Sequence, residues 1–347
     1  MIQKLGVDNK YFYLYADCKP VKGFKNSAIY DLMKGEIHIF PTSYYELLTS
    51  FRKYTIKQLE ESLRKQDSEN LKKFLKFLID NDLGTFVDDI TLFPEIDASW
   101  DHPSPITNAI VDVGEKEYNI NMVLQQLDEL RVTNIQFRFF KITSFKELRN
   151  KLSNVKNTDI KSVEVISPWH SSLTPSNVDK LIDSNYRVTD VYLYGAPENK
   201  VHILKIAKLI SRGRIIYSKE QINSCESCGL INKKSFCTPS ISNFNELLSY
   251  NGCLNRKISV DVNGYIKNCP SMKTSYGHVS SASLVDVLKE SNFKKYWSIK
   301  KDDIEVCKDC EFRYVCTDCR VYIQDEKNLF SKPAKCNYDP YTTEWKI

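Results

Sequence analysis

The sequence predicts an α/β protein in three parts: a small domain of strands followed by helices, an open parallel sheet with crossover helices, and a cysteine-rich C-terminal domain. Three observations support this. Aromatic strand-like segments precede helical ones in residues 1–93, strand and helix segments alternate in 94–222, and ten of eleven cysteines lie in 223–347. A chain of 347 residues is also long enough for more than one domain.

Residues 1–93 predict a winged-helix-like domain, in which a hairpin is followed by three short helices. Lys34-Gly35 separates two strand-like segments and is typical of a turn. Apolar residues then recur at helical spacing before Gly84, which offers a helix stop. Two residue pairs have the spacing of capping boxes at helix starts: Ser43 with Glu46, and Thr55 with Gln58.

Residues 94–222 predict a partial, open (β/α) barrel. Proline and acidic residues cluster at 94–105, a composition that favours a linker at the domain boundary. Beyond it, buried strands alternate with helices, which indicates a parallel sheet, and four such units are too few to close an eight-stranded barrel. The strands are expected at 106–113, 134–140, 162–168 and 188–195, and helix starts at Ser144 with Glu147 and at Thr174-Pro175.

Charge and hydropathy argue against two classes of partner. The net charge of +5 comes from 49 basic and 44 acidic residues spread along the chain, whereas a nucleic-acid partner normally needs a concentrated basic face. The N-terminus lacks the pattern of an export signal, and apolar stretches are broken by lysine well short of a spanning length. We therefore expect a cytoplasmic protein with neither a nucleic-acid nor a membrane partner.

The cysteine cluster predicts a metal site, because thiols gathered in a reducing compartment usually bind metal rather than form disulfides. Cys253 and Cys269 flank Asn263-Gly264, a strong hairpin signal whose turn positions tolerate positive φ. The hairpin would bring its two cysteines together. Iron–sulfur clusters and structural zinc both accept four such ligands. The run CKDCEFRYVCTDC and a later residue supply five more thiols: Cys307, Cys310, Cys316, Cys319 and Cys336.

This order of cysteines around a glycine hairpin resembles the SPASM domain, whose members typically hold two auxiliary 4Fe-4S clusters. Two residues separate Cys316 from Cys319, where the usual pattern has three. The resemblance implies that one cluster is held by Cys307, Cys310, Cys316 and Cys336, and the other by Cys253, Cys269, Cys319 and one upstream thiol. The upstream candidates are Cys225 and Cys228, with Cys237 nearby, and Cys18 is expected to be a packed thiol.

The chain lacks the CxxxCxxC motif with which radical S-adenosylmethionine enzymes bind their cofactor. The corresponding stretch, residues 106–121, contains no cysteine, so no S-adenosylmethionine is expected. P-loop, dinucleotide and HExxH motifs are also missing from the sequence. His170 and His278 are the remaining acid–base candidates, and loop histidines of this kind are usually ordinary surface residues. We expect no independent catalysis.

The cysteine-rich segments from SCESCG to SKPAKCNYDPYTTEW resemble more closely the peptide maturase of grasp-with-spasm systems. That family implies a ribosomal precursor peptide and a partner ATP-grasp ligase that forms macrocyclic ester or amide links. The N-terminal domain would bind the leader peptide at a sheet edge, or serve only as a packing module. The expected groove comprises Ser27, Ile29, Tyr30, Leu32, Tyr44, Leu48 and Phe51.

Three functions stay open at this point. The first is a cluster-bearing accessory protein that presents the precursor to the ligase. The second is a redox enzyme that modifies the peptide with its clusters directly. The third is a structural zinc scaffold, because zinc also occupies thiolate sites.

Overall fold

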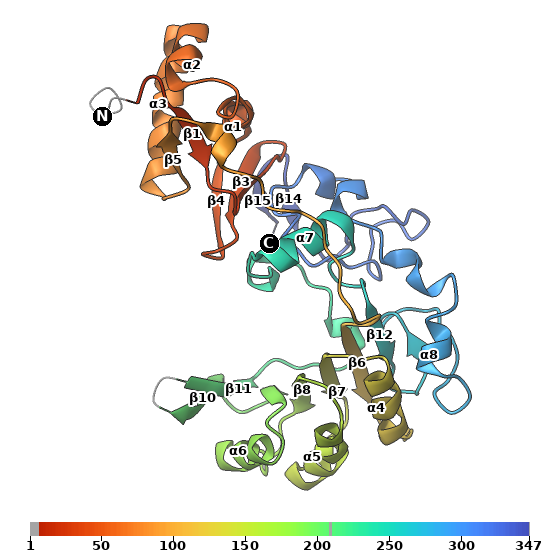
Figure 1. Ribbon diagram of the computed structural model, residues 1–347. Helices are drawn as coiled ribbons and strands as arrows, with labels where there is room; N and C mark the ends of the chain where they lie inside the picture. The colour runs from red at the N-terminus through yellow and green to blue at the C-terminus, as the bar shows by residue number, and fades with distance from the viewer. Residues whose placement is uncertain (1–6, 208–209, 347) are drawn as a thin grey trace.

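The computed structural model describes residues 7–207 and 210–346. Within these residues the chain is a mixed α/β structure with eight α-helices and one large, mostly parallel sheet of eight strands, so the predicted α/β class is confirmed. The N-terminal strands and helices lie at one end of the molecule and the large sheet at the other, with the C-terminal residues between them (Figure 1).

The N-terminal part contains a three-stranded antiparallel sheet in the order β2-β3-β4. The predicted turn at Lys34-Gly35 joins β3 to β4, and Gly35 has a φ of 72°, a value that glycine adopts without strain. A separate two-stranded sheet forms where β1, near the start of this part, pairs with β5, near its end. The elements are β1 (Tyr11–Leu14), β2 (Cys18–Val21), β3 (Asn26–Asp31), β4 (Glu36–Pro41), α1 (Tyr45–Ser50), α2 (Ile56–Ser62), α3 (Lys65–Asp80) and β5 (Gly84–Val87).

Two of the predicted helix signals in this part need correction. Thr55 forms the expected capping box with Gln58, but Ser43 lies inside a 3₁₀ turn, so α1 begins at Tyr45 without a side-chain cap. Gly84 does not end α3, which stops at Asp80; it starts β5 instead, where a Cβ would lie 2.3 Å from the Tyr13 carbonyl oxygen. The helical repeat itself is confirmed, because α3 buries Leu71, Phe74, Leu75 and Leu78.

The large sheet has the strand order β10-β11-β9-β8-β7-β6-β12-β13, and its six central strands are parallel. The four predicted strands and the helices between them are confirmed. Ser144 forms its capping box and Thr174 caps a helix with proline in its first turn. The elements are β6 (Asn108–Val113), α4 (Ile120–Glu129), β7 (Asn134–Phe139), α5 (Phe145–Leu152), β8 (Ser162–Pro168), α6 (Pro175–Ser184), β9 (Val188–Tyr194), β10 (Lys200–Ala207), β11 (Ile210–Ser218), β12 (Lys257–Val260) and β13 (Ile266–Lys267).

The sheet crosses the boundary that the sequence predicts between residues 222 and 223. β12 pairs in parallel with β6, from Lys257 opposite Asn108 to Val260 opposite Val111. Its apolar residues Ile258 and Val260 belong to the same core as the strands of the middle part. The cysteine-rich region therefore begins inside the sheet and is fixed directly to it.

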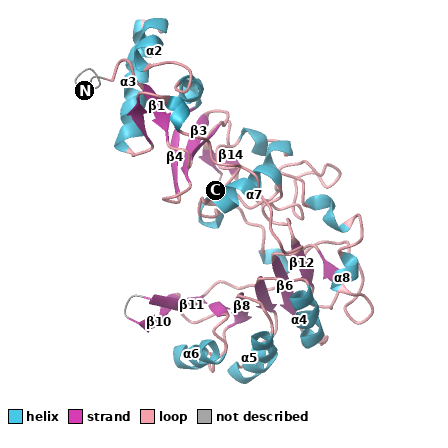
Figure 2. Ribbon diagram, in the orientation of Figure 1, coloured by secondary structure: helices cyan, strands magenta, loops and turns pink. Residues whose placement is uncertain are grey.

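One face of the sheet is covered by helices and the other is polar. α4, α5 and α6 lie on the same side of the strands (Figure 2), and alternate residues such as Phe137 and Val165 are buried beneath them. The intervening residues include Gln136 and Glu164, which stand opposite each other in the ladder and share a hydrogen bond of 2.6 Å. This alternation explains why the strands have mixed rather than wholly apolar sequences.

The N-terminal sheet packs against the cysteine-rich region. Buried Tyr30 of β3 meets Phe244 of α7 (Ile241–Ser249) and lies in one apolar cluster with Val315. The Tyr30 hydroxyl also donates to the Glu311 carbonyl oxygen at 2.5 Å. The two regions thus share a core, so more than the linker at 94–105 joins them.

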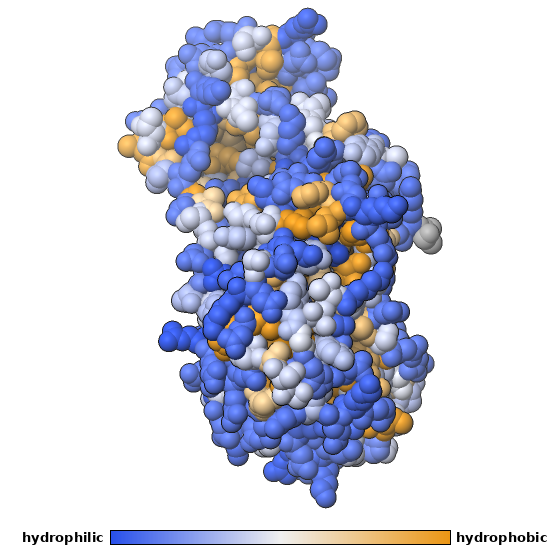
Figure 3. All heavy atoms as spheres, turned by 90° about the vertical axis from the view of Figure 1, so that its right-hand side faces the viewer, coloured by the Kyte–Doolittle hydropathy of each residue, from blue (hydrophilic) through white to orange (hydrophobic). Residues whose placement is uncertain are grey.

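The molecular surface is largely hydrophilic on the side shown in Figure 3, where apolar residues form separate patches divided by polar side chains. None of the helices in the described residues has both the length and the apolar character that crossing a membrane requires.

Candidate metal centre

All eleven cysteines are free thiols. Four of them line one small pocket in the C-terminal region, and we call this set group A. The pocket is otherwise lined mainly by apolar side chains, among them Phe236, Phe312 and Trp345, and by three basic ones. This lining leaves the sulfur atoms as the main metal-binding atoms that face the pocket. Group A comprises Cys307, Cys310, Cys316 and Cys336.

The thiols of group A influence one another through their charges. Burial raises the pKa of Cys316 to about 12; the nearby Lys301 ammonium opposes the rise, and Cys307 and Cys336 add to it. Burial likewise raises the pKa of Cys307 and Cys310. Buried thiols whose pKa is raised in this way are typical of a site where a bound metal stabilises the thiolates.

A tight backbone turn at residues 306–310 directs the Cys307 and Cys310 sulfur atoms toward the pocket. Cys307 opens a 3₁₀ turn that follows Val306, whose φ of 65° is unusual for a β-branched residue. The amide of Phe312 donates to the Cys310 sulfur at 3.4 Å. The CxxC spacing of this turn brings both thiols to the same side, as the sequence predicted.

A second set of four thiols, which we call group B, lies at the start of β12 and the end of the β12–β13 hairpin. Burial raises the pKa of Cys269 to about 12, and the charges of Cys253 and Cys228 contribute to that rise. Cys319 is half-buried, and its thiol lies near the same two residues. The Lys257 ammonium lies 3.6 Å from the Cys253 sulfur. Group B comprises Cys228, Cys253, Cys269 and Cys319.

Two glycines allow the approach of the group B loops. Gly264 turns the hairpin with a φ of 84°, and Gly229 has a φ of 91° with its missing Cβ only 3.2 Å from the Cys319 sulfur. Asn263 is not among the described residues with positive φ. The predicted two-residue turn is therefore wrong: the loop is longer, because the amide of Asp261 donates to the Tyr265 carbonyl oxygen across it.

The structure separates the three upstream candidates. Cys228 joins group B and is exposed, whereas Cys225 stays at its rim, where its carbonyl oxygen accepts a hydrogen bond from Ser271. Cys237 is occupied elsewhere, because its thiol donates to the Val315 carbonyl oxygen at 3.1 Å. Cys18 is buried in the N-terminal part, as expected of a packed thiol.

In neither group do three sulfur atoms all lie within 4.8 Å of one another. Across residues 7–207 and 210–346, the one set of three metal-binding side chains whose ligand atoms all lie within 4.8 Å of one another is Asp17, Cys18 and Asp31. The sequence analysis missed that set, although Cys18 and Asp31 are cross-strand neighbours. Lys34 already lies 3.3 Å from the Asp31 carboxylate and balances its charge.

The residues expected to form a peptide groove do not form one at β3. This strand is central, paired with β2 on one side and β4 on the other, so no peptide can add to it. Tyr44 is half-buried and stacks on Phe74 with ring centroids 5.0 Å apart. Leu48 and Phe51 are buried but line a separate pocket together with residues of β1 and β2. The other residues of the expected groove are buried in the interior: Ser27, Ile29, Tyr30 and Leu32.

The carboxyl ends of β6 and β7 carry an ion pair and no thiols. Asp112 accepts two hydrogen bonds from Arg138, at 2.6 and 2.8 Å, and both side chains are buried. Burial raises the pKa of Asp112 to about 6, although Arg138 opposes the rise. The two histidines make local contacts: His170 hydrogen-bonds with Ser172 at 2.8 Å and His278 with Ser280 at 2.7 Å.

Comparison with known proteins adds no family to this picture. No protein-family model matches the chain, and a search of curated proteins found no match. The arrangement of the thiols is therefore the feature of the molecule that points to a function.

Proposed function

We propose that the chain is an iron–sulfur accessory protein of the SPASM type, which acts in the maturation of a ribosomally made peptide. The observation that carries the proposal is the gathering of eight thiols into two groups of four. The ligand sets match the division that the resemblance implies, with Cys228 as the upstream member of group B. Each group would hold one 4Fe-4S cluster, which supplies one-electron chemistry when bound.

The spacing of the sulfur atoms favours clusters over single zinc ions. Zn–S bonds of about 2.3 Å in a tetrahedron place the sulfur atoms about 3.8 Å apart. No three cysteines in the described ranges come within 4.8 Å of one another. A cluster holds its thiolates farther apart, since each sulfur binds a different iron atom.

Cations beside the thiols also support negatively charged clusters in both groups. Lys301 lies 3.9 Å from the Cys307 sulfur in group A, and Lys257 lies 3.6 Å from the Cys253 sulfur in group B. An ammonium withdrawn from water needs a compensating charge. For Lys301 the Asp318 carboxylate, which it shares with Arg320, supplies part of that charge. The thiolates around a cluster would supply the rest, and for Lys257 they would supply all of it.

We further propose that the precursor peptide adds to β4, whose outer edge pairs with no other strand within residues 7–207 and 210–346. Ile39 of this strand is 38% exposed and offers an apolar contact. Added strands gain affinity from backbone hydrogen bonds and selectivity from alternate side chains. Ring closure itself would be performed by a partner ATP-grasp ligase, since P-loop and other nucleotide signatures are missing from this sequence.

Binding of a neighbouring precursor peptide tests the accessory role. We expect the fluorescently labelled precursor to bind the full chain, and Ile39→Lys to weaken binding because it places charge at the peptide contact. Met33→Lys is the matched control, because Met33 is 72% exposed in the turn before β4. Equal affinity of both variants and the unaltered chain would move the peptide site elsewhere.

Incubation with S-adenosylmethionine and a reductant tests the absence of radical chemistry. We expect no 5′-deoxyadenosine, because residues 106–121 contain no cysteine. Release of 5′-deoxyadenosine would favour the alternative of an enzyme that modifies the peptide directly.

A further inference from the structure

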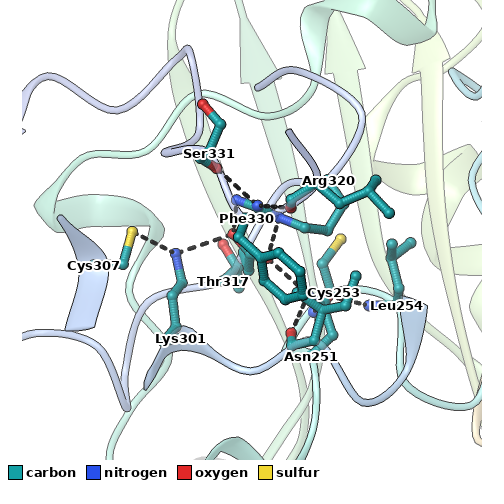
Figure 4. A network of polar contacts seen from close by, with 12 residues as sticks. Asn251, Cys253, Leu254, Lys301, Cys307, Thr317, Arg320, Phe330 and Ser331 are labelled. Atoms are coloured by element: carbon teal, nitrogen blue, oxygen red, sulfur yellow. Dashed lines mark hydrogen bonds and ion pairs between the residues drawn. The ribbon is translucent and has the colours of Figure 1, made fainter. Parts of the chain in front are cut away.

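A buried polar network centred on Asp318 lies between the two thiol groups. Figure 4 shows its members Asn251, Lys301 and Arg320, with Cys307 on one side and Cys253 on the other. The carboxylate accepts a hydrogen bond from Arg320 at 2.8 Å and another from the Asn251 amide at 2.7 Å. The Lys301 ammonium lies 3.2 Å from it. All four residues are at least 96% buried.

The network reaches a ligand in each group. On one side, Lys301 contacts the Cys307 sulfur of group A at 3.9 Å. On the other side, the Asn251 side-chain oxygen accepts the backbone amide of Cys253 in group B at 3.1 Å. Asp318 itself stands between Cys316 of group A and Cys319 of group B in the chain.

The charges of this network depend on the carboxylate. Two buried cations, Lys301 and Arg320, share Asp318 as their carboxylate partner. Removal of one member of a buried ion pair leaves the other unsatisfied, which is far more costly than removal of both. Arg320 also holds the 329–331 loop through the carbonyl oxygens of Leu329 and Ser331. Loss of Asp318 would therefore loosen Asn251, which holds the Cys253 amide, on one side and Lys301, which contacts the Cys307 sulfur, on the other.

We infer that Asp318 is a positioning residue that couples the two thiol groups, so that filling either group with its metal centre stabilises the ligand geometry of the other. The coupling is reciprocal, because a free energy shared between two sites acts equally in both directions. This inference rests on the proposed function, in which each group holds a metal centre.

Alkylation of individual cysteines measures the coupling. The full chain is reconstituted with ferrous iron and sulfide without oxygen, then treated with iodoacetamide, and each cysteine is followed by mass spectrometry. In the unaltered chain all eight thiols of groups A and B should be protected. Asp318→Asn should raise the alkylation rate of Cys307 and Cys253 by about tenfold, the effect expected from loss of a hydrogen bond to a charged group. The control is Asp303→Asn, an exposed change of equal charge.

A second variant leaves the network intact and guards against misfolding of the first. Cys336→Ala removes one ligand of group A, and the coupling predicts faster alkylation of Cys253 and Cys269 in group B. Unchanged protection of group B in this variant, or loss of protection in group A alone after Asp318→Asn, would overturn the inference. Unprotected thiols in the reconstituted unaltered chain would instead overturn the proposed function, and the coupling with it.

Discussion

At the scale of single residues, the proposed function depends on the cysteine sulfur atoms and on the charged side chains beside them. The sequence predicted most members of groups A and B, because CxxC spacing and a glycine hairpin leave few other ways to place these thiols. It left the upstream ligand open, since Cys225, Cys228 and Cys237 are close in the chain. The sequence did not predict a role for Lys301 or Asp318, because buried lysines and aspartates cannot be told from exposed ones in a sequence. Only the three-dimensional contacts distinguish them.

Replacement of one group B ligand should remove one centre. We expect Cys269→Ser to retain about half of the iron of the unaltered protein, because three thiols and a hydroxyl hold a cluster poorly. Cys237→Ser should keep all of it, since the Cys237 thiol is bound to the Val315 carbonyl oxygen. Iron analysis of the two purified variants checks the prediction, and loss of iron from Cys237→Ser would place that residue in the ligand set.

At the scale of elements, the strands and helices of the large sheet were predictable because their apolar periods are regular. The exceptions have local causes. Gly84 is a strand residue, since its lack of a Cβ lets it approach the Tyr13 carbonyl oxygen. β3 is central rather than at an edge, because it pairs with both β2 and β4. The sequence did not predict this position, because β2 is only four residues long and too short to stand out.

The β12–β13 turn should be sensitive at one residue and tolerant at its neighbour. Gly264→Val should lower the free energy of unfolding by about 1–3 kcal/mol, because a β-branched residue is strained at positive φ. The added Cβ would also lie 2.5 Å from the His278 ring. Asn263→Ala should have a much smaller effect, and chemical denaturation of both variants compares them. Equal losses would mean that both residues need positive φ.

The α3 helix should show the usual contrast between its buried and exposed faces. Leu78→Ala should cost about 2–5 kcal/mol of stability, since it opens a cavity in a closed core. Ile79→Ala, on the outer face and 42% exposed, should cost far less. Urea denaturation curves followed by circular dichroism test this, and similar midpoints for the two variants would contradict the packing described.

At the scale of the whole molecule, the three predicted parts are not structurally independent, because they share a sheet and an apolar core. β12 joins the sheet to the cysteine-rich region, and the core around Tyr30 and Val315 joins that region to the N-terminal sheet. Composition marked the linker at 94–105 but gave no sign of these contacts, which involve residues more than a hundred positions apart. Truncation of residues 1–93 would therefore expose apolar surface, so point variants are the better test of peptide binding.

The contact between the N-terminal sheet and the cysteine-rich region should be measurable through one hydroxyl. Tyr30→Phe removes the bond to the Glu311 carbonyl oxygen and should lower the free energy of unfolding by about 1 kcal/mol. Tyr54→Phe is the control, because Tyr54 is 49% exposed. Thermal unfolding of both variants decides the matter, and an unchanged transition for Tyr30→Phe would show that the bond adds nothing.

Iron and acid-labile sulfide in anaerobically purified protein test the central claim most directly. Two groups of four thiolates predict two 4Fe-4S clusters, which is about eight iron and eight sulfide per chain, with a brown colour and broad visible absorption. Protein that carries one or two zinc ions per chain, no sulfide and no visible absorption, even after anaerobic reconstitution with iron and sulfide, would contradict the account.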